Sequence, residues 1–228
     1  MKSKQLLLAA AAFAVTIFPV SGNAATFTAV QTSDECSPTP CGILAVNTVT
    51  ITDVSPGVIE LKASLPATWG FILREGGNDA SFAFGSRLPF FVLTVQPDTT
   101  FASTWSTLSN QSSIFMGGFL FTPLAYAANT SRGSSLGPGN NLLDLDITVS
   151  PSFTATAFVN SLAPALGGPG GPAFFAADVL NANNGAIGVI NYGQPLAVPG
   201  PIAGAGLPGL IFAGGGLLGW WRRRQKIA

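Results

Sequence analysis

Short runs of alternating apolar and polar residues, separated by turn-forming residues, are the feature that most constrains the fold of this chain. Because side chains of a β-strand alternate between its two faces, such runs predict half-buried strands. The runs lie at 45–52, 57–65, 80–84, 90–96, 114–121, 143–149, 153–159 and 186–192. Between 25 and 195 no segment of ten or more residues has convincing helical periodicity, and only 160–177 could hold a short helix. The pattern predicts an all-β fold, a single antiparallel β-sandwich or jelly-roll-like domain.

One β-hairpin is expected at 68–85. Phe71 and Leu73 would share a face of its first strand, residues 75–79 would turn, and Phe82 and Phe84 would return on the second strand.

The first 24 residues have the layout of a secretory signal peptide. Lys2 and Lys4 precede an apolar run at 6–20, and Gly22 and Ala24 have the spacing of a cleavage site. The alternative is a membrane-spanning or buried helix, but the run is shorter than the roughly 20 apolar residues that a span needs. An exported domain would then occupy 25–195.

Residues 196–228 have the features of a membrane anchor. The segment 202–221 carries no charge and is long enough to cross a bilayer as a helix. Trp220 and Trp221 would lie at the membrane–water interface. Positive charge directly after a span keeps the following residues on the cytoplasmic side of the membrane. That charge comes from Arg222, Arg223 and Arg224. The domain would therefore lie outside the inner membrane and the tail inside it.

The tail also carries a resemblance. Val198, Pro199, Gly200 and Pro201, followed by the span and the arginines, resemble the PEP-CTERM class of sorting signals. Val-Pro-Gly-Pro stands where that family has Pro-Glu-Pro, so the tail is closer to a variant of the VPGPIAGAGLPGL type. Residues 68–85 also resemble uncharacterised β-rich PEP-CTERM domains.

The resemblance implies processing by an exosortase, a membrane-embedded cysteine transpeptidase. The protein would be anchored transiently in the inner membrane of a Gram-negative bacterium and then passed to the cell surface or the medium. Association with exopolysaccharide or biofilm is also implied. A plain C-terminal membrane anchor is the alternative.

Charge and composition limit the chemistry of the domain. All ten acidic residues lie between Asp34 and Asp178, among only four basic ones, and an acidic domain repels nucleic acid. The chain has no histidine, the commonest general base and metal ligand. We therefore expect a non-enzymatic protein without a cofactor. The alternative is a carboxylate-dependent hydrolase using acids such as Glu60, Glu75 and Asp79.

Cys36 and Cys41 are the only cysteines and are expected to form a disulfide in an oxidising compartment. The alternative, a redox or metal pair, lacks both the Cys-x-x-Cys spacing and further ligands.

Two further residue pairs are candidates for binding. Asp144 and Asp146 would share one face of a strand and could hold Ca²⁺ with help from Asn140 and Asn141, or simply form its solvent face. Trp69 and Trp105 could stack on sugar rings, which would make the domain a carbohydrate-binding module, or could belong to the core.

Overall fold

A computed structural model describes residues 24–73, 80–89, 91–131, 139–168 and 171–198. The predicted signal peptide up to residue 23, the turn at 75–79 and the tail beyond 198 lie outside these ranges. Within the described residues, no helix is both long and apolar enough to cross a membrane.

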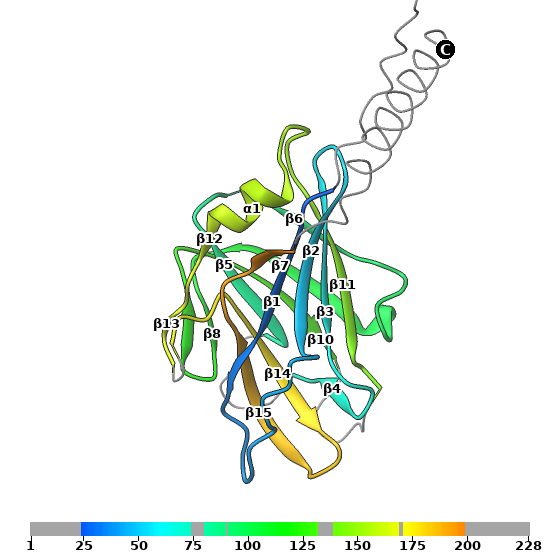
Figure 1. Ribbon diagram of the computed structural model, residues 1–228, viewed down its shortest axis with the longest axis vertical. Helices are drawn as coiled ribbons and strands as arrows, with labels where there is room; N and C mark the ends of the chain where they lie inside the picture. Colours follow the sequence, from blue (N-terminus) through cyan, green and yellow to red (C-terminus); the bar gives the residue numbers. More distant parts are fainter. Residues whose placement is uncertain (1–23, 74–79, 90, 132–138, 169–170, 199–228) are drawn as a thin grey trace, which may run out of the picture.

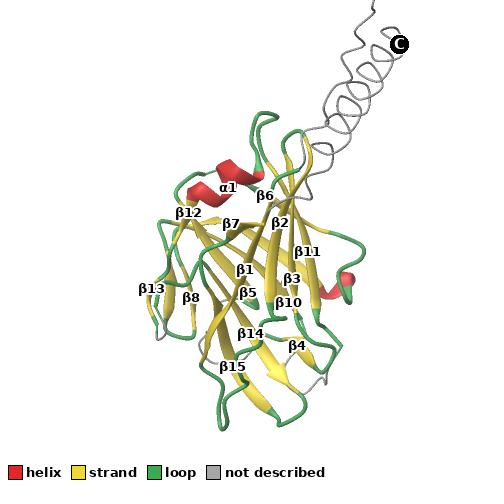
Figure 2. Ribbon diagram, in the orientation of Figure 1, coloured by secondary structure: helices red, strands yellow, loops and turns green. Residues whose placement is uncertain are grey.

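The described strands form one large antiparallel sheet and one small one (Figures 1 and 2). The large sheet follows the order β6-β11-β3-β2-β1-β15-β14-β5-β10-β7, with β4, β12 and β16 pairing beside this path. Its strands are β1 (Thr26–Asp34), β2 (Thr48–Ser55), β3 (Val58–Ser64), β4 (Trp69–Phe71), β5 (Phe82–Ser86), β6 (Val92–Val95), β7 (Trp105–Gln111), β10 (Leu124–Thr130), β11 (Leu142–Thr148), β12 (Leu162–Ala163), β14 (Phe175–Asn181), β15 (Ala186–Tyr192) and β16 (Leu196–Val198).

The large sheet curls into a nearly closed barrel. Its two end strands, β6 and β7, lie against each other, and the Thr107 hydroxyl donates to the Leu93 carbonyl at 3.3 Å. The all-β antiparallel prediction is confirmed, whereas the main sheet is a barrel rather than half of a two-layered sandwich. Alternation identifies the inward face of each strand, but closure depends on the approach of strands that are distant in sequence.

Aromatic side chains fill the barrel. Phe84 stacks on Tyr126 with ring centroids 5.3 Å apart and meets Phe158 edge-on at 5.6 Å. Phe82 stacks on Phe175 at 6.0 Å. All five are fully buried, so the phenylalanine-rich composition of the chain supplies this core.

The small sheet covers part of the outside of the barrel. It consists of β8 (Ile114–Met116), β9 (Phe119–Phe121) and β13 (Leu166–Gly167), in the order β13-β9-β8. Its large side chains pack on alanines that point outward from β5, β10 and β14, such as Ala83, Ala127 and Ala176. Alternation of large inward and small outward residues therefore creates a second core beneath this sheet.

The sequence at 153–159 forms a helix instead of the expected strand. In α1 (Ala155–Ser161), the Thr154 hydroxyl caps the first turn by accepting from the Ala157 N–H at 3.3 Å. Ala155 and Phe158 face the core, at the i, i+3 spacing of one helix face. Only one turn and a half of apolar periodicity is present, too little to distinguish the helix from a strand. Of the region 160–177, where a helix could fit, only 160–161 are helical, as the end of α1, and the rest contributes β12, β13 and part of β14.

The expected hairpin at 68–85 is also absent. β4 and β5 both pair with β14, with Phe71 opposite Val179 and Phe84 opposite Phe175. The two strands therefore follow each other along one edge of β14 and do not pair with each other there. Similarly, 114–121 is not one strand but two, β8 and β9, joined at Gly117 and Gly118, both of which have positive φ.

Residues 196–198, assigned to the tail from the sequence, form β16 and pair with β1. The barrel therefore extends to Val198, the first residue of the predicted sorting motif.

Candidate functional site

The open outer face of β2, β3 and β11 carries the densest group of charged side chains that the structure describes. Register places Asp144 opposite Lys62 and Asp146 opposite Glu60, all pointing away from the barrel interior. Asp98, between β6 and η1 (Ala102–Thr104), approaches the same lysine. We call these five residues the Lys62 cluster.

Lys62 is the centre of this cluster. Its ammonium lies 2.8 Å from Glu60 Oε1, 2.8 Å from Asp144 Oδ2 and 3.5 Å from Asp98 Oδ2. The hydrogen bond with Asp144 is the main cause of a raised Lys62 pKa, followed by the one with Glu60. The ammonium therefore stays charged and partly neutralises the surrounding carboxylates.

Asp144 is the buried member. Its side chain is only 1% exposed, and its Oδ1 has no hydrogen-bond partner among the described residues. Burial raises its pKa to about 6, against the opposing hydrogen bond from Lys62, and neighbouring Asp98 raises it further. Burial also raises the pKa of Asp146, with a further contribution from Glu60. The free energy of burying these carboxylates makes the cluster sensitive to pH.

The arrangement does not support the predicted calcium site. The ammonium of Lys62 holds Oδ2 of Asp144, the other carboxylate oxygen is buried, and no group of three metal-ligating residues is arranged for a metal within the described part of the chain. The Asn140 side chain accepts a hydrogen bond from the Trp105 indole N–H and donates one to the Phe71 carbonyl. The Asn141 side chain donates to the Leu65 carbonyl at 3.3 Å. The two asparagines therefore hold strand ends together.

The two tryptophans belong to the core, which corrects the expectation of glycan contact. Trp69 is 1% exposed and Trp105 is 8% exposed. Trp105 packs edge-on against Phe71 at 5.7 Å, and its indole N–H donates to the Thr100 carbonyl at 3.2 Å. A sugar ring needs an open aromatic face, which neither residue presents.

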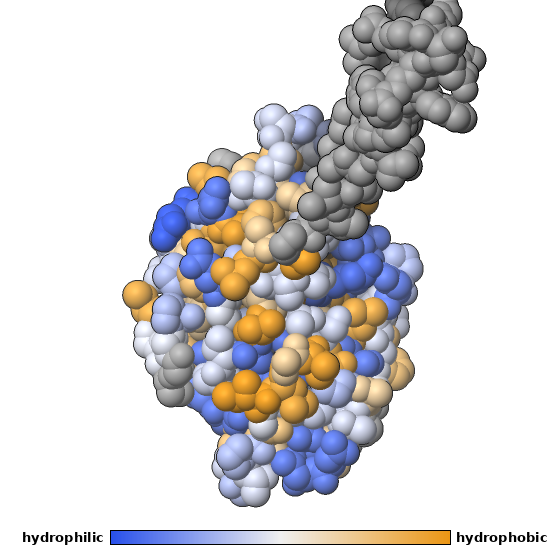
Figure 3. Space-filling view, viewed as in Figure 1, coloured by the Kyte–Doolittle hydropathy of each residue, from blue (hydrophilic) through white to orange (hydrophobic). Residues whose placement is uncertain are grey.

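Polar and apolar residues divide the rest of this face. Thr28 and Thr50 continue the row of Lys62 and Asp144 across β2 and β1. Beyond them lie exposed Val30 on β1 and Leu196 on β16, and Figure 3 shows apolar side chains gathered where β1 runs. The face therefore passes from charged to hydroxyl-bearing to apolar.

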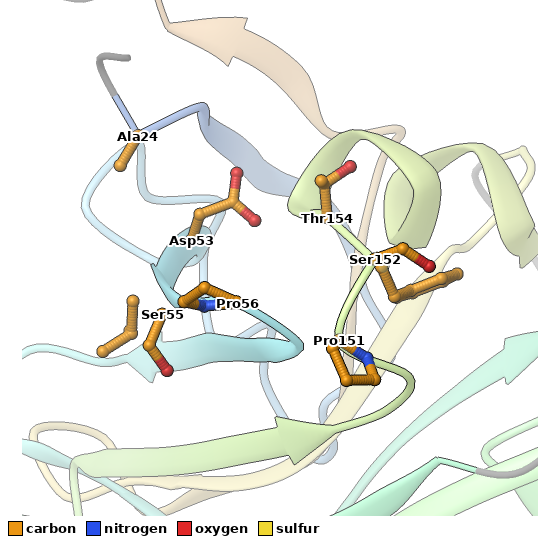
Figure 4. Close-up of a pocket in the computed structure, with 9 residues that line it drawn as sticks. Ala24, Asp53, Ser55, Pro56, Pro151, Ser152 and Thr154 are labelled. Atoms are coloured by element: carbon orange, nitrogen blue, oxygen red, sulfur yellow. The ribbon is translucent and has the colours of Figure 1, made fainter. Parts of the chain in front are cut away.

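A shallow cavity of about 530 Å³ lies at the end of the barrel where β1 begins (Figure 4). The β2–β3 hairpin, including Asp53 and Pro56, forms one side, and residues 151–154 before α1 form the other. Gly57 has a positive φ of 77°, and a Cβ there would lie 2.9 Å from Pro151, so glycine permits this close approach. Asp53 accepts from the Ala155 N–H at 2.6 Å and so connects the two sides. The alternation pattern gave no sign of this cavity, because it forms between loops.

The predicted disulfide joins Cys36 and Cys41. It closes a loop after β1, at the opposite end of the barrel from the cavity (Figure 1). Gly188 makes room for it, because a Cβ at that position would collide with the Cys36 Cα and the Glu35 carbonyl oxygen.

Comparison with protein-family models, curated proteins and solved structures finds no match to the chain.

Proposed function

We propose that the chain is an exported, non-enzymatic surface or extracellular-matrix protein of a Gram-negative bacterium, associated with exopolysaccharide or biofilm. The observation that carries this proposal is the order of the chain. A signal-like segment comes first, a disulfide-bearing β-barrel follows, and a proline motif, an uncharged span and an arginine cluster come last. This order fits export, transient anchoring and sorting by a PEP-CTERM-like tail.

The Cys36–Cys41 disulfide supports export, because such bonds persist in oxidising compartments and are rare in the cytosol. The extent of the barrel supports it as well. Its described strands run from Thr26 to Val198, so the barrel occupies the stretch between the signal-like segment and the uncharged span. An exosortase-like enzyme is accordingly the proposed partner in the membrane.

The alternatives have less support. A carbohydrate-binding module would need contacts other than the two buried tryptophans. A carboxylate-dependent hydrolase would need an acid and a base across a cleft, whereas Glu60 lies on an open sheet face, bonded to Lys62. Glu75 and Asp79 lie outside the described residues.

The sorting tail can be tested by altering its basic stop in a Gram-negative host that makes an exosortase. We expect the full chain to become labelled by a membrane-impermeant biotin reagent on intact cells. R222Q/R223Q/R224Q should lose surface labelling, because the positive charge that holds the C-terminus on the cytoplasmic side of the membrane would be removed. K226Q is the matched control and should be labelled like the unaltered chain. Equal surface labelling of the triple variant, or a full chain confined to the cytoplasm, would overturn the proposal.

A further inference from the structure

Both ends of the described chain leave the barrel at the same place. Thr26, at the start of β1, is the antiparallel partner of Val198, at the end of β16. The β2–β3 turn and the segment before α1 lie at this end as well (Figure 1). We call it the tether end, comprising residues 53–57, 92, 149–154 and 198.

The predicted span begins very close to this end. Only residues 199–201 separate Val198 from the first residue of the span, Ile202. An extended chain advances at most about 3.6 Å per residue, so this connection reaches no more than roughly 14 Å. The headgroup layer of one leaflet is itself roughly 5–8 Å thick. Because β16 is paired with β1, residues 196–198 are held in the barrel and cannot lengthen this connection.

The surface of the tether end suits contact with lipid. Residues 54–57 and 149–154 contain no charged residue. Val54 is 58% exposed and Val92 is 60% exposed, and Pro56 and Pro151 are exposed beside them. The carboxylate of Asp53 is engaged by the Ala155 N–H. Exposed apolar side chains at a surface with few charges partition into a membrane interface.

We propose that the tether end rests on the outer surface of the inner membrane while the protein is anchored. The partner is the lipid surface itself, and the inference rests on the proposed function because it needs residues 202–221 to span the bilayer. The disulfide loop and the β14–β15 turn then point away from the membrane. In this orientation the residues that follow Val198 would meet a membrane-embedded processing enzyme at the surface of the bilayer.

Energy transfer from the protein to labelled lipids tests this orientation. The full chain is reconstituted into phosphatidylcholine vesicles that contain a headgroup-labelled acceptor lipid. A donor dye is attached at S55C on the β2–β3 turn or, as matched control, at A182C on the β14–β15 turn; both positions are exposed. We expect several-fold higher transfer from position 55. Equal transfer, or higher transfer from position 182, would overturn the inference.

Flotation of the same vesicles separates the two proposals. If the chain does not float with lipid, the span is absent, and both the anchoring and the orientation are overturned. If it floats and transfer from the two positions is equal, only the orientation fails.

A longer tether separates adhesion of the surface from the constraint of a short linker. With about twelve glycine and serine residues inserted after Val198, the linker no longer forces contact. Transfer from position 55 should remain higher than from position 182, because the apolar end still adheres. Adding V54E and V92E to the lengthened chain should make the two positions equal. Equal transfer before these charges are added, or no change after them, would show that the surface does not bind lipid.

Discussion

The outside of the barrel differs between two regions whose inward faces are alike. Outside β5, β10 and β14, alanines such as Ala83, Ala127 and Ala176 are covered by the small sheet. Outside β2, β3 and β11, no second sheet covers the threonines and the Lys62 cluster, of which only Asp144 is buried. All six strands bury large apolar residues inward. The difference teaches that the size and charge of the outward residue decide whether a second layer can pack on a strand.

The largest effect is expected in the small sheet. Phe121 is fully buried against the alanine-lined face. F121A should lower the free energy of unfolding by about 3–5 kcal/mol, because it leaves a cavity in the second core. T94A, on the exposed side of β6 next to Asp146, is the control and should change it by less than about 0.5 kcal/mol. Urea unfolding of the purified protein measures both, and equal effects would remove the distinction between the two regions.

In the open region, replacing Lys62 should have the largest effect on the free energy of unfolding. K62M should lower the free energy of unfolding by about 2–4 kcal/mol at pH 7.5, because the buried carboxyl group of Asp144 would lose its cationic partner. The loss should be smaller at pH 5, where Asp144 can take up a proton. Urea unfolding of both proteins at the two pH values measures this difference. A loss independent of pH would mean that the lysine acts through packing alone.

Replacing an outward-facing residue with leucine should destabilise the covered region more than the open one. A127L should lower the free energy of unfolding by about 1–3 kcal/mol, because no space exists beneath the small sheet. The matched change T52L, on the open face of β2, should alter it by less than about 0.5 kcal/mol. Thermal unfolding reports both. If A127L is tolerated as well as T52L, the second core is not tightly packed.

The smallest effect concerns pH. Because the folded pKa of Asp144 is raised to about 6, the folded state holds a proton that the unfolded state releases near pH 4. The stabilising contribution is complete below about pH 4 and is lost as pH rises through about 6; the raised pKa of Asp146 acts in the same direction. We expect the free energy of unfolding to fall by about 1 kcal/mol between pH 5 and 7.5.

D144N should flatten this dependence over the same interval, since an amide does not titrate. Urea unfolding at the two pH values tests it. An unchanged or steeper fall in D144N would contradict the assignment of the effect to Asp144.

The sequence predicted part of this structure correctly for a physical reason. Alternation identified β2, β3 and β11 to within a few residues, because the buried apolar residues of each strand share one face. β14 was not predicted, because all of its residues are buried and none alternates in polarity. α1 was misassigned because seven residues are too few for periods of two and 3.6 to be told apart.

The candidate site shows the same limits. The shared face of Asp144 and Asp146 could be predicted from spacing within one strand. Their partner Lys62 could not, because strand register between β3 and β11 joins residues far apart in sequence. The burial of Trp69 and Trp105 likewise depends on the closure of the barrel, which local patterns do not contain.

The central claim is that the barrel is exported with a removable signal peptide before it and a sorting tail after it. Its most direct test is the intact mass of the protein recovered from cells and medium of a native-like host. We predict loss of residues 1–24 and of the tail beyond about Pro201, with the Cys36–Cys41 disulfide retained. A mass that includes residues 1–24 would contradict export. Loss of the signal with Arg222–Arg224 retained would contradict sorting and leave a plain membrane-anchored protein.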